Sequence, residues 1–185
     1  WVTGEMYANA LVTAGVENAE VNITAPFNVS GTAALTGVMK AFEKATGKKI
    51  STEAKKAANE ELFVTSDLGD DIGKEKAVDL IQKIKRQVIK DKVKNPDDIR
   101  KIIEFIAKEL DITLTDAQVE QILTLMEKIS RLDLNINKIS EQLDKISANI
   151  DSLKKTVEEN KGLIQKILDR INVFFSWLRQ VFNVA

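Results

Sequence analysis

Residues 132–157, LDLNINKISEQLDKISANIDSLKKTV, decide the architecture expected of this chain. From Leu132 onward, apolar residues recur in alternating steps of four and three, the heptad spacing of a coiled-coil seam. The helix that carries them is expected to begin earlier, because Thr115 and Gln118 fit a capping box. We therefore predict one continuous helix from Thr115 to Glu159, about 45 residues and ~65 Å long at 1.5 Å per residue.

A seam this narrow needs a partner helix. Two arrangements would supply one: self-association with other copies, or a break at residues 160–162 after which residues 163–182 fold back as a hairpin. The register continues unshifted through Asn160, which favours self-association, whereas Asn160 and Gly162 together favour a turn. The predicted oligomer seam consists of Ile136, Ile139, Leu143, Ile146, Ile150, Leu153, Val157, Asn160, Ile164, Ile167 and Ile171.

Residues 1–112 are predicted to form a small helix–strand–helix head followed by further helices. Residues 19–25 alternate between apolar and polar side chains before Pro26, a pattern typical of a half-buried strand. One strand is not stable alone, so it would pair with residues 1–3 or with a segment outside this chain. The predicted fold class is mainly α (α+β), with the head at 1–112, a heptad helix at 113–185 and a candidate hinge at 160–162.

Capping residues predict the boundaries of the other helices. Ser30, Ser51 and Asn95 each precede a run of apolar residues at helical spacing, and Asn95 is followed by a proline at the first helical position. Gly47 is expected to end the helix that Ser30 begins. The helix from Ser51 is expected to end near Leu62, before a polar loop over residues 65–71.

Composition excludes several classes of function. The 27 Lys and Arg residues balance 28 Asp and Glu residues, so the chain has no excess positive charge for binding nucleic acid. It contains no His and no Cys, which excludes imidazole bases, thiol nucleophiles, disulfides and zinc sites built on these ligands. We predict no cofactor and no metal site. The acidic cluster within residues 67–75 is better explained as a helix entrance than as a weak cation site.

Candidate functional residues are few. Glu5 and Tyr7, beside the Ser-, Thr- and Gly-rich turn at residues 29–37, suggest a recognition surface formed by Glu5, Tyr7, Thr32 and Thr36. No catalytic residues are predicted, because nothing in the spacing of Glu5, Glu17 and Glu20 pairs two carboxylates as glycan hydrolysis requires. Such a cell-wall hydrolase stays an alternative. A membrane-surface role is another, because the apolar face after Gly162 is broad and contains Trp177.

Four stretches carry a family resemblance: residues 3–16 (TGEMYANALVTAGV), Pro26-Phe27, residues 31–38 (GTAALTGV) and residues 58–73. They resemble the YpuA-like proteins, a family of predicted secreted proteins of unknown function from Gram-positive bacteria. The resemblance covers roughly residues 1–130 and implies no catalytic residues. It implies a secreted or cell-envelope location, and a residue 1 that lies inside a longer parent protein. We therefore expect an exported, non-catalytic binding or structural module with a self-associating helical tail.

Overall fold

The computed structural model of the chain describes residues 2–23, 29–135, 137–146 and 148. The chain divides into two units, residues 1–146 and residues 147–185. The first is called the N-terminal unit below. It extends beyond the head expected at residues 1–112, because the chain that follows residue 112 packs on the helices before it.

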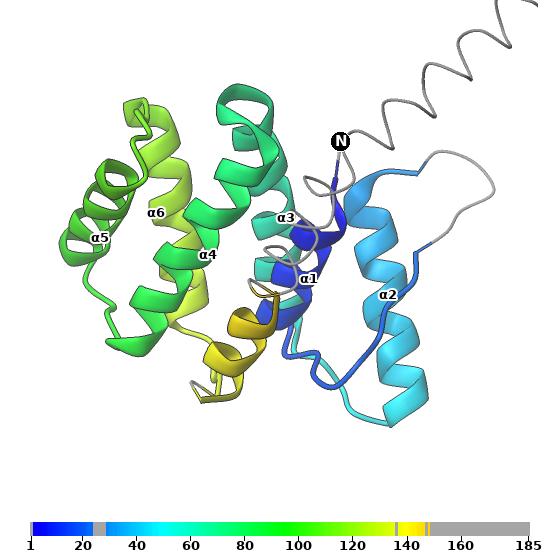
Figure 1. The fold of residues 1–185 in the computed structure, drawn as a ribbon. Helices are drawn as coiled ribbons and strands as arrows, with labels where there is room; N and C mark the ends of the chain where they lie inside the picture. Colours follow the sequence, from blue (N-terminus) through cyan, green and yellow to red (C-terminus); the bar gives the residue numbers. More distant parts are fainter. Residues whose placement is uncertain (1, 24–28, 136, 147, 149–185) are drawn as a thin grey trace, which may run out of the picture. The chain divides into compact units, whose positions relative to one another are not determined.

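The described part of the N-terminal unit is helical (Figure 1). Its helices are α1 (Gly4–Thr13), α2 (Gly31–Thr46), α3 (Thr52–Ile72), α4 (Lys74–Lys90), α5 (Pro96–Glu109) and α6 (Asp116–Ser130). Residues 137–146 are helical as well.

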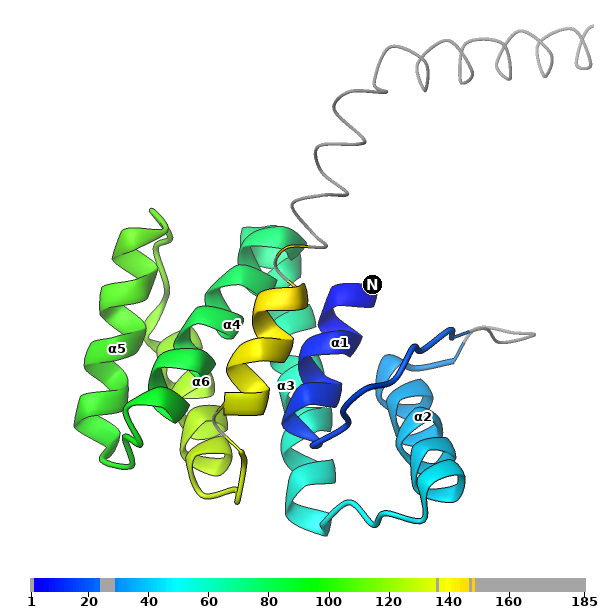
Figure 2. The ribbon, with the colours of Figure 1, turned by 60° about the horizontal axis from the view of Figure 1, so that its bottom comes forward.

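Helix α3 lies at the centre of this unit. It contacts α1, α2, α4 and α6, and α5 packs against α4 and α6. Figures 1 and 2 show α2 and α5 at opposite edges. The central position follows from the sequence of α3, in which buried residues, most of them small or apolar, recur at helical spacing. They are Ala54, Ala57, Ala58, Glu61, Leu62, Val64, Thr65, Leu68 and Gly69. Small residues allow neighbouring helices to approach closely.

The predicted caps are confirmed. The side chains of Ser30 and Ser51 accept hydrogen bonds from the backbone N–H three residues on, at 3.2 and 3.1 Å. Asn95 accepts from the N–H of Asp97 at 2.8 Å. Thr115 and Gln118 form both bonds of the capping box, which satisfies two backbone donors at the start of α6.

The predicted α+β head is wrong, because the described residues contain no strand. Residues 19–23 have neither helical nor sheet structure, and residues 24–25 lie outside the described part of the chain. Alternation of apolar and polar residues favours an extended backbone, but a strand also needs a hydrogen-bonded neighbour. No described segment supplies one here.

The predicted loop at residues 65–71 is wrong too, because α3 continues through it to Ile72. The polar residues of this stretch lie mostly on the exposed side of the helix, while Thr65, Leu68 and Gly69 are buried. A Cβ at Gly69 would lie 3.2 Å from Met6 Cε and 3.3 Å from Lys74 Cα. Gly69 therefore allows α1 and the start of α4 to pack closely against α3. It does not end α3.

The predicted continuous helix from Thr115 is broken. Helix α6 ends at Ser130, and residues 131–135 have no helical structure. Asn135 then caps the following helical residues, because its side chain accepts a hydrogen bond from the N–H of Lys138 at 3.1 Å. The break lets Ile139 and Leu143 join the core of the N-terminal unit, with 5% and 0% of their surfaces exposed.

Candidate functional site

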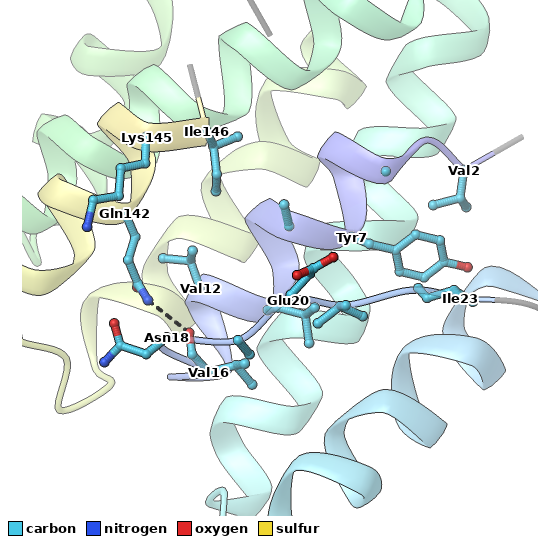
Figure 3. A pocket seen from close by; sticks show the side chains of 15 residues that line it. Val2, Tyr7, Val12, Val16, Asn18, Glu20, Ile23, Gln142, Lys145 and Ile146 are labelled. Carbon is cyan, nitrogen blue, oxygen red and sulfur yellow. Dashed lines mark hydrogen bonds between the residues drawn. The ribbon is translucent and has the colours of Figure 1, made fainter. Parts of the chain in front are cut away.

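A groove of about 740 Å³ lies between α1, the non-helical residues 16–23 and the helical residues 142–146 (Figure 3). This volume falls within the range of small-ligand pockets. Most of its lining is apolar. The lining residues are Val2, Gly4, Tyr7, Ala8, Leu11, Val12, Val16, Asn18, Ala19, Glu20, Val21, Ile23, Gln142, Lys145 and Ile146.

Helix α1 forms one wall of the groove. Its inner face buries Met6, Ala10 and Thr13 against the rest of the unit, which leaves Tyr7 and Ala8 on the groove side. Tyr7 is half-buried, and burial raises the pKa of its phenol. The phenol therefore stays protonated at neutral pH and can donate a hydrogen bond as well as accept one.

The second wall begins where the chain leaves α1 at Gly15, whose φ of +78° suits glycine. The N–H of Val16 donates to the carbonyl of Leu11 at 3.0 Å. Gln142 Nε2 then donates to the carbonyl of Val16 at 3.1 Å, a bond that Figure 3 marks. These contacts fix the start of the extended wall against both α1 and the helical residues 137–146.

Glu17 holds the same segment from the outside. Its carboxylate pairs with Lys48 at 3.0 Å and with Lys138 at 2.7 Å. The hydrogen bonds from Lys138 and Lys48 lower the pKa of Glu17 below its ordinary value of 4.5. The two ion pairs of Glu17 therefore hold this segment in place, and Glu17 itself does not line the groove.

Two charged side chains line the groove itself. Lys145 pairs with Glu141 at 3.2 Å. Glu20 is exposed, and among the described residues it has no hydrogen-bond or ion-pair partner. It is also the one carboxylate among the residues that line the groove. The groove thus combines an apolar surface with one unpaired negative charge.

A buried polar cluster fixes α1 in place behind the groove. Lys85 of α4 donates three hydrogen bonds: to Glu61 Oε1 at 2.7 Å, to the Asn9 carbonyl at 2.8 Å and to Thr13 Oγ1 at 3.0 Å. Thr13 Oγ1 also donates to Glu61 Oε2. Burial lowers the pKa of Lys85 below its usual value, and the negative charge of Glu61 opposes that shift. Since the ammonium of Lys85 and the carboxylate of Glu61 are fully buried, they serve to join helices and are not accessible to a ligand.

The sequence contains a signal for this cluster, although the spacing of apolar residues alone does not reveal it. Lys85 lies among Ile81, Ile84 and Val88 on the apolar face of α4, and Glu61 lies on the apolar face of α3. Charged residues at core positions are rare unless they are paired. One acid and one base, each on the inner face of adjacent helices, therefore predict a buried ion pair.

The predicted recognition surface is divided in the structure. Tyr7 lines the groove, whereas Glu5, Thr32 and Thr36 do not. Thr36 Oγ1 donates to the carbonyl of Thr32 at 2.9 Å, within α2. Tyr7 still lies beside the start of α2, because a Cβ at Gly31 would lie 3.5 Å from its hydroxyl oxygen.

The described part of the predicted oligomer seam belongs to the N-terminal unit itself. Ile139 and Leu143 are buried in its core, and Ile146 packs on that core while it also lines the groove. The other seam positions, Ile136, Ile150, Leu153, Val157, Asn160, Ile164, Ile167 and Ile171, lie outside the described residues. The candidate hinge at residues 160–162 and the apolar stretch around Trp177 lie outside them too.

A second groove, of about 410 Å³, lies between α4 and α5 beside the exposed Phe105. Its cations are already paired: Lys83 with Asp79, Arg86 with Asp144 and Lys101 with Asp98. Glu109 also lines this groove and has no partner among the described residues, so the second groove differs from the groove beside α1 mainly in its smaller volume.

The acidic residues after Ser66 take part in contacts between helices. Asp67 accepts a hydrogen bond from Gln121 at 3.2 Å, and Asp71 accepts one from Gln118 at 2.9 Å. No group of three or more potential metal ligands occurs among the described residues. No helix in that part of the chain is long and apolar enough to cross a membrane.

Comparison with known proteins agrees with this division of the chain. The sequence profile of the family described as "Protein of unknown function (DUF1002)" matches residues 1–146, which is the range of the N-terminal unit. The "Uncharacterized protein YpuA" of Bacillus subtilis (strain 168) is 47% identical over 169 residues, which cover 91% of this chain and 58% of that relative. The chain thus spans less than two thirds of the length of this relative. No solved structure matches the present chain. The chain therefore belongs to the DUF1002 family, which confirms the resemblance to YpuA-like proteins found in its sequence.

Proposed function

We propose that the N-terminal unit is a non-catalytic binding module and that the groove beside α1 is its binding site. The observation that carries the proposal is the groove itself, which exposes an apolar surface together with the Glu20 carboxylate, for which no described residue is a partner. Binding sites typically combine an apolar lining with a few polar groups that orient the ligand. The Tyr7 hydroxyl, Glu20 and the Lys145 ammonium supply such groups.

Two features support binding over catalysis. Hydrolysis of a glycan by the usual route needs two carboxyl groups on either side of the bond that is broken. Among the residues that line the groove, Glu20 supplies one such group, and Glu17 is held outside by Lys48 and Lys138. The chain also contains no His or Cys to act as a base or nucleophile.

We further propose that the module acts outside the cytoplasm or at the cell envelope, as the family resemblance implies. The tail is proposed to self-associate, which would place several grooves in one assembly. Several sites on one particle raise the apparent affinity for a repetitive surface without any new contact. This arrangement suits a protein that binds weakly at each site.

The test is binding of the neutral fluorescent probe N-phenylnaphthylamine to the full-length chain. Ala8 lines the groove, so the large side chain of Ala8→Trp fills it and is expected to abolish the fluorescence increase. The matched control is Ala41→Trp, on the exposed side of α2 and outside the groove, which should bind the probe as the wild type does. Equal binding by all three proteins would show that the groove is not the site and would overturn the proposal.

A further inference from the structure

The extended wall of the groove has an unusual backbone. Residues 17–23 make no backbone–backbone hydrogen bond with any described residue, and residues 18–23 are exposed. The segment is nevertheless held at its start by Gln142 on Val16 and by two lysines on Glu17. Asn18 has a φ of +53°, which turns the chain, and the strand-like part of the wall is residues 19–23. A backbone segment with free N–H and C=O groups is a template on which an extended segment can pair.

The side chains of this wall also fit a strand edge. Ala19, Val21 and Ile23 are spaced two apart, and all three line the groove. Val21 and Ile23 are exposed by 37% and 40%, which is large for β-branched residues in a pattern typical of a half-buried strand. A segment that paired with this wall would cover them with its own apolar side chains at alternate positions.

The charge of the groove indicates which charged side chain the pairing segment would carry. The first 39 residues contain Glu5, Glu17 and Glu20 and no Lys or Arg. Glu17 is neutralised by lysines from elsewhere in the chain, whereas Glu20 lines the groove without a partner among the described residues. A basic side chain in the ligand would complement Glu20.

We propose that the groove takes an extended peptide, which adds as a strand along residues 19–23. The peptide has apolar residues at alternate positions and one Lys or Arg that pairs with Glu20. This inference rests on the proposed function, because it names the ligand class of the same groove. Backbone hydrogen bonds would supply affinity, while the apolar surface and Glu20 would select the sequence.

The experiment uses the full-length chain and a short labelled peptide that alternates valine with threonine and has a central lysine. Binding is followed by fluorescence anisotropy. Methylation of alternate backbone nitrogens removes the N–H donors of one peptide edge, and we expect it to weaken binding at least about tenfold. Glu20→Lys should lower the affinity for the lysine peptide by about tenfold or more. It should raise the affinity for a peptide that has glutamate in place of the lysine. The control Glu104→Lys, on the exposed side of α5, should change neither.

The remaining outcomes separate this inference from the proposed function. If the methylated peptide binds as tightly as its parent, or if no peptide displaces the naphthylamine probe, strand addition is wrong while Ala8-dependent probe binding still supports the groove. If Ala8→Trp leaves probe binding unchanged, both proposals fail. If the peptide dissociates an oligomer of the chain, the natural occupant is a second copy, and a separate peptide ligand is excluded.

Discussion

The Nζ atom of Lys85 lies 2.7 Å from Oε1 of Glu61, and neither side chain has any exposed surface. The two residues come from adjacent helices, α4 and α3. Thr13 and the Asn9 carbonyl of α1 complete the coordination of the ammonium. This one cation therefore joins the three helices that support the groove, and its removal is the most direct test of how they are held together.

We predict that Lys85→Met will destabilise the protein by about 3–5 kcal/mol, because it leaves the carboxylate of Glu61 buried without its counter-ion. Glu61→Met should cost a similar amount. The double substitution should be closer to the wild type than either single one, since it removes both charges and keeps similar volumes. Urea unfolding followed by circular dichroism measures all three proteins.

A neighbouring lysine provides the control for this series. Lys83 lies two residues earlier on α4, has half of its side chain exposed and pairs with Asp79 on the surface. Lys83→Met should change stability by less than about 0.5 kcal/mol. If the double variant were less stable than both single variants, loss of the ion pair would not explain why the single variants are destabilised.

Acid is expected to weaken the protein through Glu43. Its carboxylate accepts hydrogen bonds from Lys55 Nζ at 2.8 Å and from the N–H of Ile50 at 2.8 Å, and these bonds lower its pKa below 4.5. A carboxyl group with a lowered pKa in the folded state binds fewer protons than in the unfolded state. Its contribution is therefore present above pH 4.5 and is lost as the pH falls through the lower folded value.

The check is the melting temperature as a function of pH for the wild type, Glu43→Gln and Lys55→Met. Both variants should lose less stability than the wild type across the interval below pH 4.5, because the linked proton uptake is reduced or absent. Superimposable curves for the wild type and Glu43→Gln would contradict the prediction.

Two glycines should respond to alanine in opposite directions. Gly73 joins α3 to α4 with φ +92° and ψ +138°, a conformation that L residues rarely adopt. Gly73→Ala should therefore cost about 1–3 kcal/mol. Gly37 lies within α2, where a Cβ would meet no atom within 4 Å, so Gly37→Ala should stabilise by up to ~1 kcal/mol. Thermal unfolding of the two variants gives the comparison, and a change of the same sign in both would contradict it.

Self-association should depend on the chain after residue 146. We expect light scattering to show an oligomer for the full-length chain and a monomer for residues 1–146, which form a compact unit. A strictly monomeric full-length chain at high micromolar concentration would favour the alternative hairpin. Gly162→Ala would then be expected to destabilise a turn at that position, whereas it should stabilise a continuous helix by up to ~1 kcal/mol.

The sequence predicted helix starts well because capping is a local interaction. Ser30, Ser51, Asn95 and Thr115 each bond to a backbone N–H within three residues, so neighbouring sequence is enough to identify them. The break after Ser130 was missed although Asn135 is also a cap. Leu132 lies inside the break and still falls on a heptad position, so the heptad spacing continues across residues that are not helical.

Features that depend on distant residues were harder to predict. Of the groove, Tyr7 was identified, but the pairing of α1 with residues 16–23 and 142–146 brings together parts far apart in the chain. The alternation at residues 19–25 predicted a paired strand, and the described residues 19–23 form none. Gly69 was taken for a loop residue because its close contact with Met6 is a tertiary effect.

The hydrogen bond from Gln142 to the carbonyl of Val16 joins residues 126 positions apart. Contacts of this kind slow folding, because the entropy of closing a long loop is lost before the contact forms. During synthesis, α1 and the extended wall emerge long before residues 137–146 that hold them. The groove is therefore completed late, and a ribosome-bound chain that ends before Gln142 would present its apolar wall to chaperones.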